Sequence, residues 1–236
     1  MSSLATLPGF RRRIRIRPEA EVVRLALEDD FHHMELDLHH RAGRALAVAG
    51  RVLRAPWSTC PGAEAEIART FAGLSLADFP RRGEKRANCT HLYDLALLAA
   101  AHADDGEPLE YDLLVSDPDA AGERLAQLAR NGELLLCWRL VGDAVASPDS
   151  WRGLPLLGDA RPWLERQGPD LAEAARLLRW ASLIAHGRQI PLEAQSDARR
   201  MPPNCYSFQP GRAELARRVG RIEDFGEGRA PLEDWR

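Results

Sequence analysis

The chain has 236 residues, 45% of them hydrophobic and 28% charged, so it is long enough to bury a full core as one elaborated domain or two small ones. Its formal net charge of −3 argues against a nucleic-acid-binding protein. No apolar run is long enough to cross a bilayer, and the first residues lack the pattern of a signal peptide. We therefore expect a cytoplasmic protein with no membrane partner.

The first hundred residues predict an antiparallel β-meander followed by two helices. Arg and Ile alternate over residues 11–17, as in a half-exposed strand, with phosphate or nucleic-acid contact as the alternative reading. Short strands are predicted over 22–27, 34–38 and 45–53, and His39 and His40 are expected to face solvent beside a turn. A helix that begins at Pro61 and stops at Gly73 follows, and then a second helix capped by Asn88.

The second half predicts a hairpin and a long helix. After a strand over 111–115, the dipeptide Asn131-Gly132 separates apolar runs over 124–130 and 133–140, which is a strong hairpin signal. Cys137 lies inside the second run and is expected in the core. An amphipathic helix is predicted over 170–186 with Gly187 as its stop, and a last helix over 212–219. The tail after Gly226 is expected to be poorly ordered.

These elements predict an α+β fold in which helices pack on an antiparallel β-meander, followed by a β-hairpin and a helical second half. Residues 1–108 form the α+β region that carries the candidate site. Residues 109–225 form a hairpin-plus-helix extension packed on it, and residues 226–236 form the tail.

The candidate site depends on two cysteines. Cys60 and Cys89 each follow an irregular segment and open an apolar helical run. A thiol at a helix N-terminus feels the positive end of the macrodipole, which favours the thiolate and makes it a better metal ligand or nucleophile. A reducing compartment also favours ligands, nucleophiles or buried thiols over disulfides. The alternative is that both cysteines are small buried residues at helix starts.

A metal set is predicted if the fold brings these thiols together with Asp30, His91 or one of two adjacent histidines. In a strand only one of His32 and His33 faces the core, and the apolar phase favours His32, unless the strand begins after it. Two thiolates, an imidazole and one further donor would suit zinc or ferrous iron. A satisfied core histidine is the alternative reading, and no nucleotide cofactor is expected.

Four residues are candidates for proton transfer: His32, His33, His91 and Tyr93. His91 and Asp94 are three apart on the second predicted helix, so a carboxylate could orient the imidazole. The alternative is an exposed polar pair in the first turn. Tyr93 is four residues from Cys89 and is either a proton donor in the same pocket or a packing residue.

Three residues are candidates for substrate binding. Arg54 and Trp57 stand at the end of a strand, where a guanidinium beside an aromatic wall suits the carboxylate or phosphate of a small anion. Structural ion pairing is the alternative for Arg54. Tyr206 follows two prolines and Cys205, in a segment that could fold back over the pocket as a lid.

The order of strands, Cys60, helix, loop, Cys89 and helix over about residues 22–102 is similar to that of iron–sulfur cluster scaffold proteins of the IscU and NifU type. Cys60-Pro61-Gly62-Ala63 matches the family's second cysteine motif, and Cys89-Thr90-His91-Leu92 matches the third. The first ligand position has no cysteine here and reads Asp29-Asp30-Phe31-His32-His33. The resemblance implies an IscU/NifU-like first half and a protein that holds a cluster or metal transiently.

A second resemblance covers nearly the whole chain. Its motifs are Arg13-Ile14-Arg15, Asp30-Phe31-His32-His33-Met34, the run from Arg54 to Ala63, Cys89-Thr90-His91-Leu92-Tyr93-Asp94-Leu95 and Cys205-Tyr206-Ser207-Phe208-Gln209-Pro210. Together they resemble the bacterial family called domain of unknown function 2889. This resemblance implies a soluble bacterial protein and brings no established activity with it.

Three functions fit these residues. The first is an enzyme whose metal-bound or thiolate Cys/His site acts on a small organic catabolic intermediate by lyase, hydratase or hydrolase chemistry. The second is a metal or iron–sulfur cluster carrier, and the third is a non-catalytic module that binds a small molecule. A small-molecule substrate is the expected partner, nucleic acid is not, and homo-oligomer formation is left open.

Overall fold

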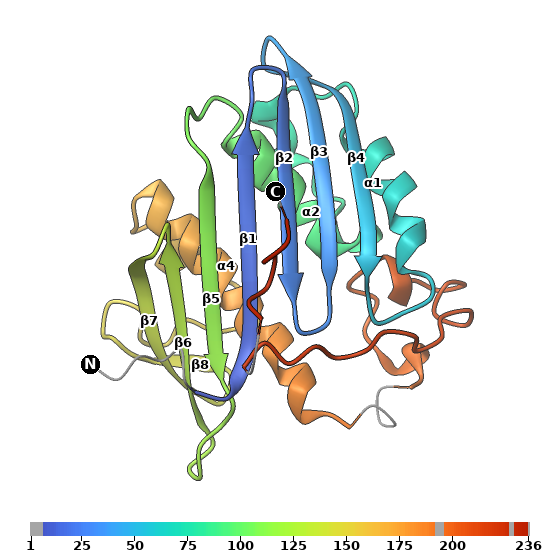
Figure 1. Ribbon diagram of the computed structural model, residues 1–236. Helices are drawn as coiled ribbons and strands as arrows, with labels where there is room; N and C mark the ends of the chain where they lie inside the picture. Colours follow the sequence, from blue (N-terminus) through green and yellow to red (C-terminus); the bar gives the residue numbers. More distant parts are fainter. Residues whose placement is uncertain (1–6, 192–195, 227–228, 236) are drawn as a thin grey trace. The chain divides into compact units, whose positions relative to one another are not determined.

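The structure is a computed structural model that describes residues 7–191, 196–226 and 229–235. It mixes α and β elements, as predicted, and its strands form an eight-stranded antiparallel sheet in the order β4-β3-β2-β1-β5-β6-β7-β8 (Figure 1). The strands are β1 (Gly9–Pro18), β2 (Val22–Asp29), β3 (His33–Arg41), β4 (Arg44–Arg54), β5 (Leu109–Ser116), β6 (Glu123–Arg130), β7 (Glu133–Val141) and β8 (Ala144–Ser147). The α-helices are α1 (Ala63–Phe71), α2 (Thr90–Ala101), α3 (Arg161–Leu164) and α4 (Pro169–Ile184).

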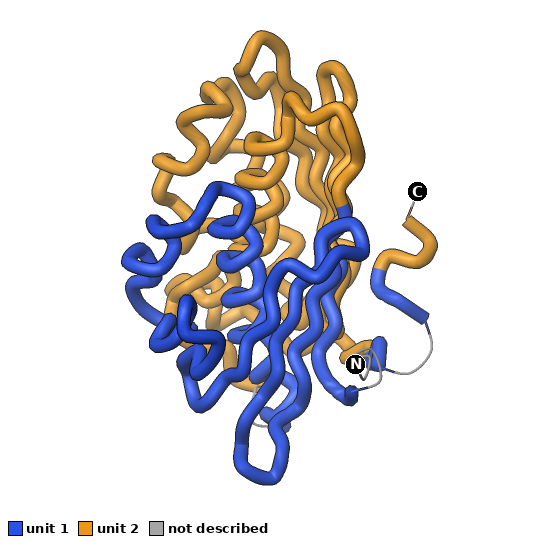
Figure 2. Tube along the Cα trace, turned by 90° about the vertical axis from the view of Figure 1, so that its left-hand side faces the viewer, with its two compact units in different colours: residues 1–13, 110–191, 224–231 blue, residues 14–109, 192–223, 232–236 orange. Residues whose placement is uncertain are grey.

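The chain divides into two compact units (Figure 2). Unit 1 contains residues 1–13, 110–191 and 224–231, and unit 2 contains residues 14–109, 192–223 and 232–236. The change of unit after residue 109 lies close to the predicted boundary after 108. The first residues belong with the later unit, however, and residues 192–223 return to the earlier one.

In unit 2 the predicted antiparallel meander is present as β2, β3 and β4. Its side chains alternate between a buried and a more exposed face. Along β3, Met34, Leu36 and Leu38 are buried, and β2 and β4 flank this strand in antiparallel register. Helices α1 and α2 pack on these strands (Figure 1). A Cβ at Gly50 of β4 would come within 3.0 Å of Ile67 and Leu92, so glycine lets both helices lie close to this strand.

The same alternation corrects one expectation. His40 follows Leu38 in phase and is buried, whereas His39 is exposed, so only one of the pair is solvated. The backbone pairing of β3 continues to Arg41, which keeps His40 on the core face.

In unit 1 the predicted hairpin joins β6 and β7. Asn131 and Gly132 both have positive φ, 48° and 81°, which a two-residue type I′ turn requires. The register of β7 buries Trp138, so its neighbour Cys137 is exposed and the core assignment for this cysteine is wrong. Helix α4 packs on β6 and β7, ends at Ile184 and continues as a 3₁₀ turn that includes Gly187.

The predictions for the C-terminal residues need two corrections. Residues 212–219 form turns and a bridge between Trp57 and Arg218, and no α-helix is assigned there. In the part of the tail that the structure describes, Leu232 is buried and its N–H donates to Glu28 Oε2 at 2.7 Å. Arg15 also donates to the carbonyl of Leu232, so apolar burial and backbone hydrogen bonds order this part of the tail.

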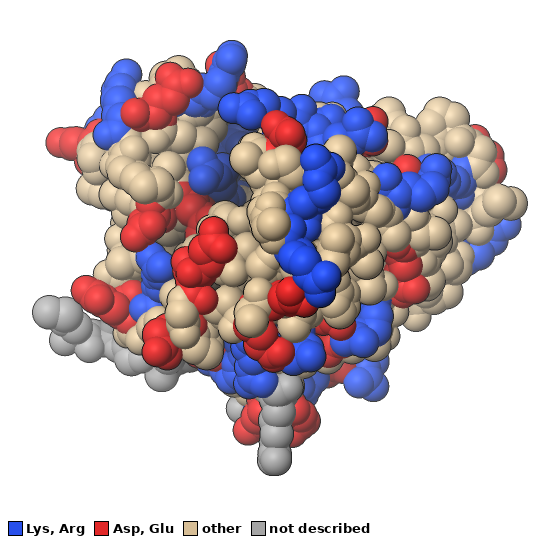
Figure 3. All heavy atoms as spheres, turned by 90° about the horizontal axis from the view of Figure 1, so that it is seen from above, with Lys and Arg blue, Asp and Glu red and all other residues tan. Residues whose placement is uncertain are grey.

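No helix among the described residues is long and apolar enough to span a membrane. On the face seen in Figure 3, Lys and Arg side chains are interspersed with Asp and Glu side chains.

Candidate metal centre

The turn between β2 and β3 is built around the carboxylate of Asp29. Its Oδ1 accepts hydrogen bonds from the backbone N–H groups of Phe31 and His32, both at 2.8 Å. An Asp side chain that bonds its own backbone two residues on is the Asx turn, which reverses the chain locally. The turn leaves His32 just before β3, which begins at His33.

Asp29, His32 and His91 form a buried cluster. His32 Nδ1 lies 3.0 Å from Asp29 Oδ1, and the rings of His32 and His91 have centroids 4.0 Å apart. Each of the three residues offers a ligand atom within 4.8 Å of the other two, and all three are buried. His91 belongs to the first turn of α2, so the cluster joins that helix to the β2–β3 turn.

His32 is therefore the inward histidine, although it precedes the strand whose phase suggested this. His33 opens β3, and its Nδ1 lies 3.7 Å from the carboxylate of Glu28. Asp30 is fully buried, but the cluster found among the described residues contains Asp29 and not Asp30. The signal for Asp29 was present in the sequence, since an Asp at the end of an apolar strand is typical of an Asx turn.

Arg54 holds the same turn from β4. Its guanidinium donates to the backbone carbonyls of Asp29 at 2.6 Å and Asp30 at 2.9 Å, and it pairs with the buried carboxylate of Glu28 at 3.3 Å. These bonds give Arg54 the structural role that was its alternative reading, and its charge is paired with Glu28.

Residues 196–223, here called the strap, run past the site within unit 2. Ser58 N donates to Arg217 O at 2.9 Å and Val219 N to Pro56 O at 3.1 Å. Farther along, Glu223 N donates to Asp30 O at 2.8 Å. The strap is therefore fixed to the end of β4 and to the β2–β3 turn.

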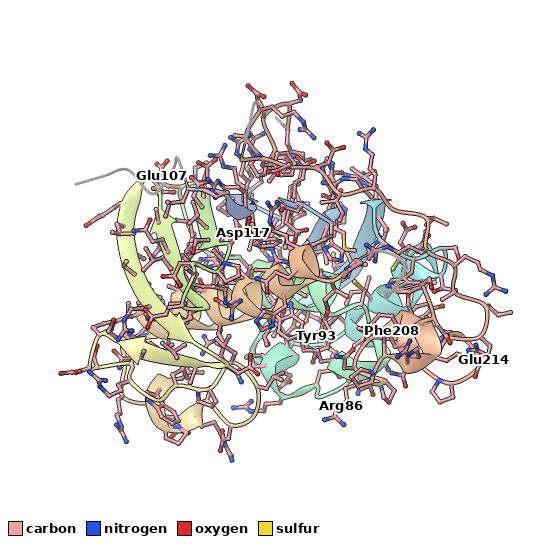
Figure 4. All side chains as sticks on the ribbon, turned by 90° about the horizontal axis from the view of Figure 1, so that it is seen from below. Arg86, Tyr93, Glu107, Asp117, Phe208 and Glu214 are labelled. Carbon is pink, nitrogen blue, oxygen red and sulfur yellow. The ribbon has the colours of Figure 1, made fainter. Side chains whose placement is uncertain are left out.

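Trp57 and Tyr206 both pack at this strap. Trp57 is buried with Ala198, Ala213 and Ala216, and its ring meets Phe208 edge to face at 5.7 Å between centroids. The Tyr206 ring lies under the guanidinium of Arg212 at 3.8 Å and against Gly62. Figure 4 labels Phe208 and Glu214 on this segment.

The strap brings Cys205 close to the two predicted cysteines. Tyr206 N donates to Asn88 O at 2.9 Å, which places Cys205 and Cys89 on adjoining segments. Cys60 Sγ lies 3.3 Å from Ser207 Oγ. Cys89 Sγ contacts Met34 Sδ at 3.7 Å from the N-cap position of α2. Three thiols from distant parts of the sequence thus gather in unit 2.

The expected activation of these thiols is not found. Burial raises the pKa of Cys89 to about 12, and the neighbouring Cys60 and Cys205 thiols add to the effect. Burial likewise raises the pKa of Cys205 to about 11. Burial also raises the pKa of Cys60, although the hydrogen bond with Ser207 and the charge of Arg218 lower it in part. Desolvation disfavours the charged thiolate more than the helix terminus favours it.

Two further expectations near α2 are changed by packing. Asn88 is fully buried and its side chain bonds Thr70 and the carbonyl of Glu84, so Cys89 occupies the N-cap position without a side-chain cap. Tyr93 packs against Phe71 with ring centroids 5.0 Å apart, and burial raises the pKa of its phenol. Tyr93 lies inside the protein in Figure 4, whereas Arg86 points outward.

Asp94, the predicted orienting partner of His91, accepts two hydrogen bonds from Lys85 Nζ at 2.6 and 2.7 Å. Its carboxylate thus ties α2 to the loop before it.

A groove of about 530 Å³ lies where the end of β4 meets the strap. Arg54 and Trp57, two of the predicted substrate-binding residues, line it together with Ser58, Pro61, Arg221 and others. Arg54 also bonds the β2–β3 turn, whereas Asp29, His32 and His91 are not among the residues that line the groove.

No known protein family and no curated protein matches this sequence. The two resemblances drawn from its motifs therefore stay predictions.

Proposed function

We propose that this protein is a metal-dependent enzyme that acts on a small anionic organic molecule, with Asp29, His32 and His91 at its centre. The observation that carries the proposal is that these three buried residues offer ligand atoms within 4.8 Å of one another. Two imidazoles and a carboxylate are a donor set that suits zinc or ferrous iron with coordination positions left open.

Asp29 and Arg54 position the residues of the cluster. Asp29 Oδ1 lies 3.0 Å from His32 Nδ1, so Asp29 would orient the ring of His32 through this oxygen and offer its other carboxylate oxygen to the ion. Arg54 holds the turn that presents both residues. A bound zinc or ferrous ion would supply Lewis acidity and lower the pKa of a bound water.

His33 is the proposed proton-transfer residue. His32 and His91 are assigned as ligands, which leaves His33 as the remaining histidine of this region. Its side chain is 26% exposed, and it pairs across the strands with Arg54, which lines the groove. The carboxylate of Glu28 lies 3.7 Å from His33 Nδ1 and 3.3 Å from Arg54, so the imidazole lies beside the arginine that lines the groove.

The groove supports a small anionic substrate. Arg54 and Arg221 line it, where an anion would compete with their carboxylate partners Glu28 and Glu223, and Trp57 adds an aromatic wall. Lyase, hydratase or hydrolase chemistry fits a site in which a carboxylate substrate, a polarised water and an imidazole base meet.

Metal binding tests the proposal. Zinc or cobalt(II) is titrated into the chelator-treated full chain and into His32→Gln and His91→Gln variants, with the exposed His39→Gln on β3 as the matched control. We expect one ion bound through nitrogen and oxygen donors, in addition to any ion bound by thiolates, in the wild type and the control, and an affinity of this nitrogen/oxygen site at least tenfold weaker in both variants. Equal affinity of the nitrogen/oxygen site in all four proteins would reject the centre.

Open coordination positions are tested next. Azide or acetate added to the cobalt(II) protein should change its visible spectrum. The zinc-loaded His33→Gln variant should hydrolyse p-nitrophenyl acetate more slowly than the zinc-loaded wild type. A bound ion whose spectrum ignores added anions would make the site structural and reject the enzyme.

A further inference from the structure

We propose that Cys60, Cys89 and Cys205 form a second metal site, for a single thiophilic divalent ion such as zinc, which fastens the strap to α1 and α2. This site is separate from the Asp29, His32 and His91 centre, and its existence does not depend on the proposed function.

The first support is where the strap is fixed. Two contacts fix the strap at Tyr206 and Ser207. Tyr206 N donates a hydrogen bond to Asn88 O, and Ser207 Oγ contacts Cys60 Sγ. Cys205 adjoins the first contact, and Cys89 follows Asn88 directly. The strap therefore presents its own thiol to the two segments that carry the other two.

The second support is the difference between these cysteines and the fourth. Cys89 is buried, and Cys60 and Cys205 are mostly covered, whereas Cys137 is exposed on β7 in unit 1. Packing alone would be satisfied by any small residue at these positions and does not require a cysteine at all three.

The chemistry of the donors selects the ion. Thiolate sulfur is a soft ligand that prefers zinc and similar ions to magnesium or calcium. Each thiol releases its proton to solvent when it binds, and the positive ion replaces the protons in the buried site. Zinc–sulfur bonds of about 2.3 Å would complete three of four tetrahedral positions.

Binding should also move the strap. Among the described residues only Asp29, His32 and His91 have three ligand atoms within 4.8 Å of one another, so the three sulfur atoms are spread more widely. An ion would draw Cys205 toward α2, and occupancy would tighten the strap against Gly62 and Trp57.

Cobalt(II) spectroscopy separates this site from the first one. Thiolate ligands give an intense charge-transfer absorption that nitrogen and oxygen ligands lack. In the full chain we expect this band in the wild type, in His32→Gln and in His91→Gln, and its loss in Cys60→Ser, Cys89→Ser and Cys205→Ser. The exposed Cys137→Ser is the matched control and should keep the band. A wild-type protein that binds cobalt(II) without the band would overturn the proposal and leave the histidine centre intact.

A second measurement needs no substitution, in case the variants fail to fold. The wild-type protein is alkylated with and without zinc, and the labelled cysteines are identified by mass spectrometry. Zinc should protect Cys60, Cys89 and Cys205 together and leave Cys137 labelled, and it should slow tryptic cleavage at the strap's arginines. Unchanged alkylation of the three thiols would reject the site. Reconstitution with iron and sulfide into a cluster that the same three variants lose would reject a single ion in favour of a cluster.

Discussion

The imidazole rings of His32 and His91 lie with centroids 4.0 Å apart and planes inclined by 32°. One ring comes from the β2–β3 turn and the other from the first turn of α2, which are far apart in the sequence. Asp29 contacts His32 Nδ1, so a carboxylate and two imidazoles meet within unit 2.

Asp29→Asn should keep the turn and weaken the metal site. The amide oxygen can still accept from the N–H groups of Phe31 and His32, but the negative charge beside the imidazole is lost. We expect metal affinity to fall about 10- to 100-fold with little change in stability. Asp29→Ala should in addition lose about 1–3 kcal/mol, because two backbone donors lose their acceptor. Calorimetric metal titration and urea unfolding measure the two effects, and the exposed Asp78→Asn serves as control.

Arg54→Ala should lower the free energy of unfolding by about 2–4 kcal/mol, because the buried carboxylate of Glu28 loses its arginine partner and the carbonyls of Asp29 and Asp30 each lose one hydrogen bond. Arg54→Lys should recover part of this, since an ammonium keeps the charge but not the fork of donors. The control is Arg51→Ala on the same strand, whose exposed pair with Glu35 should contribute less than about 1 kcal/mol. Similar losses in urea unfolding for the Arg54 and Arg51 variants would contradict the role given to Arg54.

Gly62→Ala should displace the strap. A Cβ at this position would lie 2.6 Å from the Tyr206 hydroxyl, although the backbone of Gly62 suits any residue. We expect a loss of about 1–3 kcal/mol and faster tryptic cleavage of the strap. Tyr206→Ala should lower the free energy of unfolding less in the Gly62→Ala variant than in the wild type, because removing the tyrosine ring also removes the clash with the new Cβ. Gly106→Ala, where a Cβ meets nothing within 4 Å, is the control.

The imidazole of His186 should lower the free energy of unfolding of unit 1 as the pH falls into the mildly acidic range. Burial and the nearby Arg124 lower the pKa of its imidazole, so the folded chain disfavours the proton. The unfolded chain takes that proton as the pH falls through about 6.5, so stability is complete above this pH and falls below it. His186→Gln should flatten the change in urea midpoint between about pH 7.5 and pH 5. A profile like that of the wild type, or an equal flattening in the exposed His39→Gln, would contradict this cause.

Local sequence patterns were enough to predict much of the fold. The alternation of apolar residues fixed the meander and its buried face, and the Asn131-Gly132 dipeptide fixed the hairpin, because period-two burial and positive φ are local properties. Where patterns were short, they misled. Cys137 lies in an apolar run but faces solvent, since one residue of register decides the face.

The candidate site shows the same limit. The sequence indicated that Cys60, Cys89, His32 and His91 are unusual residues at the ends of elements. Only the tertiary structure decided that Asp29 joins the two histidines and that Cys205 returns to the other thiols. It also decided that burial outweighs the helix terminus at Cys89. Spacing along a chain determines local conformation, whereas convergence and desolvation depend on how distant segments pack, which no single stretch of sequence contains.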